Sequence, residues 1–247
     1  MCSILICSFS SYISLEDSRK KIYIFTYYFW EGKVEGLSLI GIVKRYGGFT
    51  LKVERLEIGV VSVSCIRGPN GSGKTTLLNI IAGVIKPDEG RILFNGIDIT
   101  KTEPEKRRFP LIKGEKDIFP HMSVARNISI ARRVGKNDLE RIMEILGIDG
   151  EIARKKASEL STGWKIRVAL ARALASNPRV ILVDEGFDHL DNEYVKCCLK
   201  NIVEYTKEKG ILILTTTHKD LDICEKTIVL KDGKISYIAD KYMQQST

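Results

Sequence analysis

The sequence lacks the cysteine and histidine spacings that bind metals. It contains six cysteines and three histidines, but no Cys-x-x-Cys pair and no histidine at ligand spacing from a cysteine. Cys197 and Cys198 are adjacent and make a poor candidate for one bridge, since neighbouring side chains on a helix diverge. We therefore expect reduced thiols, as in most cytosolic proteins.

Long apolar runs are also missing. The run IYIFTYYFW at 22–30 is too short to cross a bilayer, which takes about 18 apolar residues or more. The first residues, MCSILICSFSSYISL, lack the basic start of a secretory signal. We expect no membrane span in the chain. Residues 1–36 form an N-terminal extension that is a surface-docking element, a poorly ordered tail or the result of a start codon chosen too early.

No internal repeat or low-complexity stretch is present, and the composition is ordinary for a globular protein, with 44% hydrophobic and 28% charged residues. A chain of 247 residues can form one large domain or a domain with a subdomain. The formal net charge of +8 favours phosphate ligands, nucleic acid or an anionic membrane face, or else serves solubility.

From about Leu37 the pattern becomes regular. Residues 59–68 are a β-branched run that ends at a glycine, and 75–84 have helical spacing. The runs at 179–185 and 210–218 are continuously apolar and end in polar residues, as buried parallel strands do. Strands that deliver polar groups at their C-terminal ends predict an α/β nucleotide-binding core.

Two hairpins and one helical insertion complete the expected organisation. Asn95-Gly96 within 87–100 and the Asp-Gly pair within 228–236 are hairpin turn signals. Residues 101–160 are charged and mostly helical in pattern, and we interpret them as an insertion into the core.

The stretch GPNGSGKTT at 68–76 fits the pattern G-x-x-x-x-G-K-[ST] and lies between an expected strand and an expected helix. Glycines let backbone N–H groups turn inward around phosphate oxygens, and the following helix adds the positive end of its dipole. Lys74 is expected to neutralise the β and γ phosphates of ATP, and the Thr75 hydroxyl to bind Mg²⁺. The residues expected to bind nucleotide are Gly68, Pro69, Asn70, Gly71, Ser72, Gly73, Lys74, Thr75 and Thr76.

Three polar residues follow the later strands. Asp184 ends an apolar run and is placed to hold the Mg²⁺ shell, and Glu185 beside it can act as general base toward a water. His218 ends the next run, where a neutral imidazole can reach the γ-phosphate or orient that base. We expect Glu185 and His218 to be catalytic.

Taken together, these segments resemble the ATP-binding subunits of ABC (ATP-binding cassette) transporters. The stretch LSTGWKIRVALARALASNPRVILVDEGFDHLD at 160–191 is similar to the family signature, its helix, the Walker B strand and the D-loop, in order. The resemblance implies an α/β P-loop NTPase (RecA-like) core with an antiparallel β subdomain and an inserted α-helical subdomain. It covers residues 37–240, with the helical subdomain at about 101–160 and a C-terminal tail at 241–247.

The resemblance also assigns residues outside the phosphate loop. Tyr46 is similar to the aromatic residue that stacks on adenine. In the family two cassettes pair head to tail around two ATP molecules, so Ser161 and Gly163 would contact the γ-phosphate held by the other subunit. Asp191 resembles the D-loop aspartate near that seam. Residues 117–128 resemble the stretch that faces the membrane subunits.

Three positions depart from the family pattern. Gly114 stands where the Q-loop glutamine usually touches Mg²⁺ and the lytic water. The signature is LSTGW where the family has LSGGQ, so Thr162 is β-branched and Trp164 replaces an amide with a ring able to pack on the ribose side or on the dimer partner. Gly186 replaces a common proline. We expect hydrolysis to survive, whereas Gly114 puts its coupling to transport in question.

The resemblance implies an ATPase that powers transport by separate permease subunits, paired with a second cassette as a homo- or heterodimer at the cytoplasmic face of the membrane. The alternative is a hydrolysis-impaired cassette that acts as the regulatory or degenerate half of a heterodimer. Import is preferred, because the short helical insertion and the stretch FPHMSV at 119–124 are more similar to importer cassettes. No regulatory C-terminal domain is expected after His218. No nucleic-acid partner is expected, since neither coiled-coil heptads nor a basic aromatic groove is present.

Overall fold

The computed structural model describes residues 13–17, 20–24, 35–59, 63–114, 117–190 and 192–241. The chain divides into two units, residues 1–33 and 34–247. In the first unit, strands β1 (Ile13–Asp17) and β2 (Lys20–Ile24) pair antiparallel. Among all the residues that the structure describes, no helix is both long and apolar enough to cross a bilayer.

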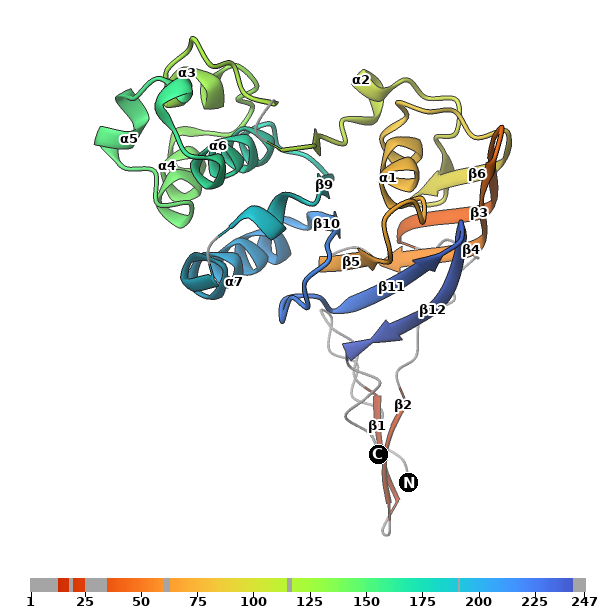
Figure 1. The fold of residues 1–247 in the computed structure, drawn as a ribbon. Coiled ribbons are helices and arrows are strands. Elements are labelled where there is room, and N and C mark those ends of the chain that lie inside the picture. The colour runs from red at the N-terminus through yellow and green to blue at the C-terminus, as the bar shows by residue number, and fades with distance from the viewer. Residues whose placement is uncertain are drawn as a thin grey trace. The chain divides into compact units, whose positions relative to one another are not determined.

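The second unit carries one mixed sheet, whose strands run in the order β7-β6-β3-β4-β12-β11-β5-β10-β9-β8 (Figure 1). Its strands are β3 (Gly36–Tyr46), β4 (Phe49–Gly59), β5 (Val63–Arg67), β6 (Glu89–Phe94), β7 (Ile97–Asp98), β8 (Leu111–Ile112), β9 (Val180–Asp184), β10 (Leu212–Thr216), β11 (Lys226–Lys231) and β12 (Lys234–Asp240). Its helices are α1 (Lys74–Ala82), α2 (Pro104–Arg107), α3 (Val124–Ser129), α4 (Lys136–Ile145), α5 (Gly150–Arg154), α6 (Thr162–Ala175) and α7 (Asn192–Lys209), with 3₁₀ turns η2 (Ala157–Glu159) and η3 (Gly186–His189).

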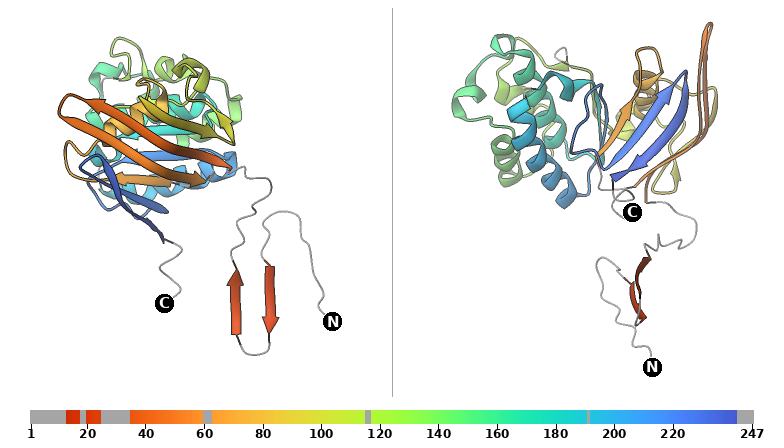
Figure 2. Two further views of the ribbon diagram at one scale, coloured as in Figure 1. Left: turned by 90° about the vertical axis from the view of Figure 1, so that its right-hand side faces the viewer. Right: turned by 60° about the horizontal axis from the view of Figure 1, so that its bottom comes forward.

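The sheet has a parallel half and an antiparallel half. Strands β11, β5, β10, β9 and β8 are mutually parallel, whereas β7, β6, β3 and β4 pair antiparallel. Figure 2 (left) shows the long strands β3 and β4 facing the viewer, with the helices behind them. The predicted α/β core with an antiparallel β subdomain is confirmed.

The parallel strands are buried on both faces, which explains their continuous apolar runs. Along β9, Val180 and Leu182 belong to the core on the α1 face, while Ile181 and Val183 belong to the core under α6 and α7. Successive strand residues point to opposite faces, so one short run fills both cores.

The predicted helical insertion is present as α3, α4 and α5, which gather with α6 on one side of β9 and β10 (Figure 1). Helix α6 packs on both α3 and α4. The short strand β8, which lies within 101–160, pairs with β9 and so is part of the central sheet. Both predicted hairpins are found, as β6–β7 and β11–β12, with positive φ angles at Asn95 and Gly96 in the first turn.

A buried arginine closes the C-terminal end of α1. The Arg107 guanidinium donates to the carbonyls of Ile80 (2.9 Å) and Ile81 (2.8 Å) in that helix, and to those of Thr100 and Thr102 (both 2.8 Å). Burial lowers the pKa of Arg107 from its ordinary value. Arg107 thus supplies hydrogen-bond donors to the last turn of α1, where the regular helical donors run out, in addition to the Gly83 N–H that donates to Ile80 at 3.1 Å.

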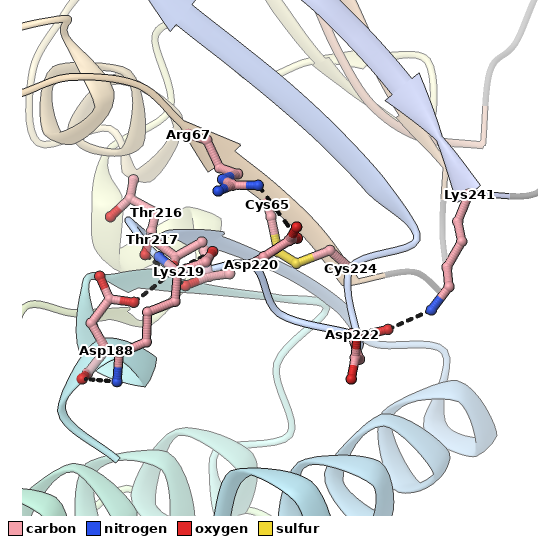
Figure 3. The surroundings of a disulfide bond; sticks show 11 residues. Cys65, Arg67, Asp188, Thr216, Thr217, Lys219, Asp220, Asp222, Cys224 and Lys241 are labelled. Atoms are coloured by element: carbon pink, nitrogen blue, oxygen red, sulfur yellow. Dashed lines mark hydrogen bonds and ion pairs between the residues drawn. A yellow bond between two sulfur atoms is a disulfide. The ribbon is translucent and has the colours of Figure 1, made fainter. Parts of the chain in front are cut away.

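The expectation of reduced thiols is wrong for two cysteines. Cys65 on β5 and Cys224, which precedes β11, form a disulfide with a Cα–Cα distance of 5.7 Å (Figure 3). The two residues meet because β5 and β11 are neighbours in the sheet. They are 159 residues apart in sequence, so the cysteine spacing carried no sign of the pairing.

Candidate nucleotide-binding site

The phosphate loop connects β5 to α1, as its sequence predicts, and its glycines adopt backbone angles that other residues avoid. Gly68, Gly71 and Gly73 have φ angles of 150°, 78° and 100°. A Cβ at Gly68 would lie 2.1 Å from the carbonyl oxygen of Leu230. The loop therefore needs glycine at position 68 for its close approach to β11.

The loop surrounds a cavity of about 350 Å³. Its lining consists of Phe49, Asn70, Gly71, Ser72, Gly73, Lys74, Thr75, Thr76 and Glu185. Lys74 is buried, and its Nζ donates to the carbonyls of Gly68 (2.9 Å) and Pro69 (3.2 Å). The Ser72 hydroxyl is also buried and has no hydrogen-bond partner among the described residues. A hollow that offers a buried ammonium, an unpaired hydroxyl and a helix N-terminus suits a phosphate group.

Two strand ends supply oxygen atoms beside the loop. Asp184 Oδ1, at the end of β9, accepts from Thr75 Oγ1 at 3.1 Å and from Thr216 Oγ1 at 2.7 Å. Because β10 lies between β5 and β9, Thr216 sits next to both the loop strand and Asp184. The structure thus brings together the two residues predicted to bind Mg²⁺, Thr75 and Asp184.

Glu185 follows Asp184 and is held in a left-handed conformation, with φ 55°. Its N–H donates to Thr216 Oγ1 at 2.9 Å, which anchors the backbone at this uncommon angle. The Glu185 carboxylate lies 3.0 Å from His218 Nε2, and both side chains are more than 40% exposed. The residues predicted as catalytic base and partner are therefore in contact, at the edge of the loop cavity.

The signature residues 160–164 lie at the start of α6, outside the lining of that cavity. Ser161 is the exposed N-cap of α6, and Gly163 lies in its first turn. Trp164 packs against the hydrophobic core of this chain, with the Arg167 guanidinium 4.3 Å from its ring centroid. The Trp164 ring therefore already packs on residues of this chain, among them Arg167. Asp191 lies outside the described residues.

Helix α6 also contacts the stretch that precedes α3. Arg172 donates to the carbonyl of Asp117, and its guanidinium lies 5.6 Å from the Phe119 ring centroid. Burial lowers the pKa of Arg172 from its ordinary value. One arginine therefore connects the signature helix to the segment at 117–119.

Two of the sequence departures have a local explanation. Gly114 has φ 122°, an angle that side-chain-bearing residues rarely adopt, and a Cβ there would meet no atom within 4 Å. At Gly186, a Cβ would lie 2.7 Å from Val183 Cγ1, too close without a shift. The backbone at Gly114 suits glycine, and the packing at Gly186 leaves little room for a larger residue.

Phe49 is an aromatic residue of the site that the sequence did not indicate. Tyr46, predicted to stack on adenine, is 44% exposed at the end of β3 and does not line the cavity. Phe49 does line it, and Tyr46 and Phe49 are paired residues of the β3–β4 hairpin. Tyr46 and Phe49 are only three positions apart in the sequence, and the local sequence pattern does not indicate which of the two rings faces the phosphate loop.

The fold and this arrangement define a nucleotide-binding α/β protein of the P-loop class. Residues 51–188 match the family model described as ABC transporter, and that match covers more than half of the chain, so the protein belongs to the ABC transporter ATP-binding family. The resemblance read from the sequence is confirmed.

Several curated proteins are similar in sequence to this chain. The molybdate/tungstate import ATP-binding protein WtpC of Pyrococcus abyssi is 36% identical over 83% of this chain and 62% of its own length. The sulfate/thiosulfate import ATP-binding protein CysA 2 of Chromobacterium violaceum is 36% identical over 83% of this chain and 58% of its own length. The chain thus spans about three fifths of the length of these curated relatives.

Solved structures support the same class. A dimeric ATP-binding cassette in a post-hydrolysis state bound to ADP and Pi has a TM-score of 0.70 at 26% identity, covering 83% of this chain and 98% of its own. The protein cbiO1 from Clostridium perfringens, part of the ABC transporter complex cbiONQ, has a TM-score of 0.74 at 27% identity, covering 87% of this chain and 92% of its own.

Proposed function

We propose that this protein is the ATP-binding and ATP-hydrolysing subunit of an ABC importer, acting as a dimer with separate permease subunits at the cytoplasmic face of the membrane. The observation that carries the proposal is the contact of Glu185 with His218 beside a loop cavity that also holds Lys74. The relatives named above as import ATP-binding proteins support the direction of transport.

The loop residues bind the phosphates of ATP. Lys74 exchanges its carbonyl partners for β- and γ-phosphate oxygens, and the backbone N–H groups at the start of α1 add their dipoles. Ser72 gains the hydrogen-bond partner that its buried hydroxyl needs. Phe49, on the wall of the same cavity, offers an aromatic face close to the bound nucleotide, and Tyr46 remains the predicted adenine-stacking residue.

The oxygens of Thr75 and Asp184 fit Mg²⁺, which is usually bound by one or two protein oxygens together with phosphates and water. When bound, Mg²⁺ neutralises charge that develops on the phosphate oxygens. Thr216 donates a second hydrogen bond to the same Asp184 oxygen, which helps the carboxylate to keep its orientation.

The chemistry assigned to this chain is an attack by water on the γ-phosphorus. Glu185 accepts a proton from that water as its oxygen bonds to phosphorus and the bond to the β-phosphate oxygen breaks. His218, at 3.0 Å, holds the Glu185 carboxylate in place, and in its Nε2–H tautomer it donates a hydrogen bond to it. Ser161 and Gly163, at the start of α6, are assigned to the γ-phosphate of a partner cassette across the dimer.

The relatives are named for molybdate/tungstate and for sulfate/thiosulfate, and further ones for spermidine/putrescine and Fe(3+) ions. Similar cassettes therefore carry names for solutes of opposite charge. We assign the energy supply to this chain and the choice of solute to its partners.

The test is steady-state hydrolysis of Mg·ATP by the purified chain over a range of protein concentrations, beside Glu185→Gln. Loss of the general base should lower turnover about 100-fold or more, while ATP affinity, measured by calorimetry, changes little. A rate that rises faster than linearly with concentration supports the dimer. ATP binding without turnover at high concentration would favour the regulatory, hydrolysis-impaired cassette, which Gly114 and Trp164 favour and the presence of Glu185 and His218 opposes.

A further inference from the structure

Asp188 lies on η3, the short 3₁₀ turn that directly follows Glu185. Its N–H donates to the Glu185 carbonyl at 3.1 Å, so the two acidic residues belong to one turn of chain. Glu185 reaches the His218 ring, as described above. Sequence reasoning gave Asp188 no role.

Both carboxylate oxygens of Asp188 are used by the loop that carries His218. Oδ2 accepts from the backbone N–H of His218 at 2.9 Å, and Oδ1 accepts from the hydroxyl of Thr217, which is fully buried. Lys219 closes the group, because its Nζ donates to the Asp188 carbonyl at 2.7 Å (Figure 3). Three consecutive residues, 217–219, are therefore held by one residue of the turn.

His218 is therefore contacted twice by residues at the same turn, once at its backbone and once at its ring. Asp188 holds its backbone N–H, and Glu185 contacts its ring at 3.0 Å. If the His218 backbone rotated away from Asp188, the imidazole ring would move with it. The distance between the ring and the Glu185 carboxylate would then increase. A hydrogen bond to a carboxylate is stronger than one between neutral groups, so this anchor resists such motion.

We infer that Asp188 is a positioning residue for hydrolysis: it sets the place of His218, which in turn orients Glu185. This inference rests on the proposed ATPase function. Asp188 is not among the residues that line the loop cavity, and its carboxylate accepts hydrogen bonds from Thr217 and His218, so its effect should fall on turnover and leave ATP binding intact.

The first experiment compares Asp188→Ala and Asp188→Asn with the unchanged protein. A misplaced catalytic group costs up to about 100-fold in rate, so we expect kcat to fall about 10- to 100-fold in Asp188→Ala with KM for ATP within about twofold. Asparagine keeps one acceptor oxygen of two, and its loss should be smaller. The matched control is Asp220→Ala in the same loop, whose 89% exposed carboxylate pairs with Arg67 at 3.3 Å and should be dispensable.

The second experiment observes His218 directly by NMR of its imidazole nitrogens. The chain has three histidines, and His218→Ala identifies the signal that belongs to position 218. We expect Asp188→Ala to shift the His218 signals and to leave those of His121 in place. The isosteric Asp188→Asn serves if the alanine variant does not fold.

The outcomes separate the two ideas. Turnover that is unchanged in the Asp188 variants, or lost together with ATP affinity while the His218 signals stay in place, overturns the positioning role. If the unchanged protein binds ATP without hydrolysing it, the proposed ATPase fails, and the NMR comparison still decides whether Asp188 holds His218.

Discussion

The Cys65–Cys224 disulfide should make a large contribution to the stability of the protein. It joins β5 to the chain just before β11 and closes a loop with a sequence separation of 159 residues. In the chain-entropy model, closing a loop of this length removes enough freedom from the unfolded state to stabilise the fold by about 5 kcal/mol at 25 °C. Measured effects are commonly smaller, so we expect its loss to lower the free energy of unfolding by about 2–5 kcal/mol.

The assay is urea unfolding of the unchanged protein and of Cys224→Ser, each with and without dithiothreitol. Cys224 is partly exposed, so serine there adds little packing cost, whereas Cys65 is fully buried. Reductant should move the unfolding midpoint of the unchanged protein down to that of Cys224→Ser and should leave the variant where it is.

Alkylation of the two cysteines gives an independent measurement. In the unfolded, unreduced protein Cys65 and Cys224 should resist alkylation, and they should become reactive after reduction, as peptide mass spectrometry of the alkylated protein shows. Alkylation of Cys65 and Cys224 before reduction, or the same reductant response in both proteins, would refute the reasoning.

Three further changes follow from particular contacts. Arg107→Met removes donors from four carbonyls and should lower the free energy of unfolding by about 3 kcal/mol, measured by urea titration. Gly186→Ala places a methyl group 2.7 Å from Val183 Cγ1 and should destabilise by about 1–3 kcal/mol, with partial recovery in Gly186→Ala/Val183→Ala, followed by thermal unfolding. Gly114→Gln should not raise ATP turnover, because φ 122° is strained for glutamine; a clear gain in kcat would show that the loop adapts.

Local patterns predicted those parts of the site that lie within short stretches of chain. The phosphate loop, with its strand and helix, was predicted from one run of residues, and Asp184, Glu185 and His218 from the ends of apolar runs. Parallel strands end at one edge of a sheet, so their proximity followed from topology.

The missed features depend on contacts between distant segments. Thr216 and Asp188 act through partners on other elements, and the pairing of Cys65 with Cys224 depends on which strands become neighbours. Nor could the apolar pattern indicate that Phe49 lines the cavity while Tyr46 does not. Such contacts are set by side-chain direction and strand order, and neither has a local sequence signal.

The strand order has a consequence for how the protein is made. Strand β5, which leads into the phosphate loop, ends at Arg67, yet its two neighbours begin at Leu212 and Lys226. During synthesis from the N-terminus, β5 therefore has no native strand beside it until the chain beyond Leu212 has left the ribosome. Such long-range pairing folds slowly, and the apolar residues of β5 stay without their native neighbours for the whole of that time.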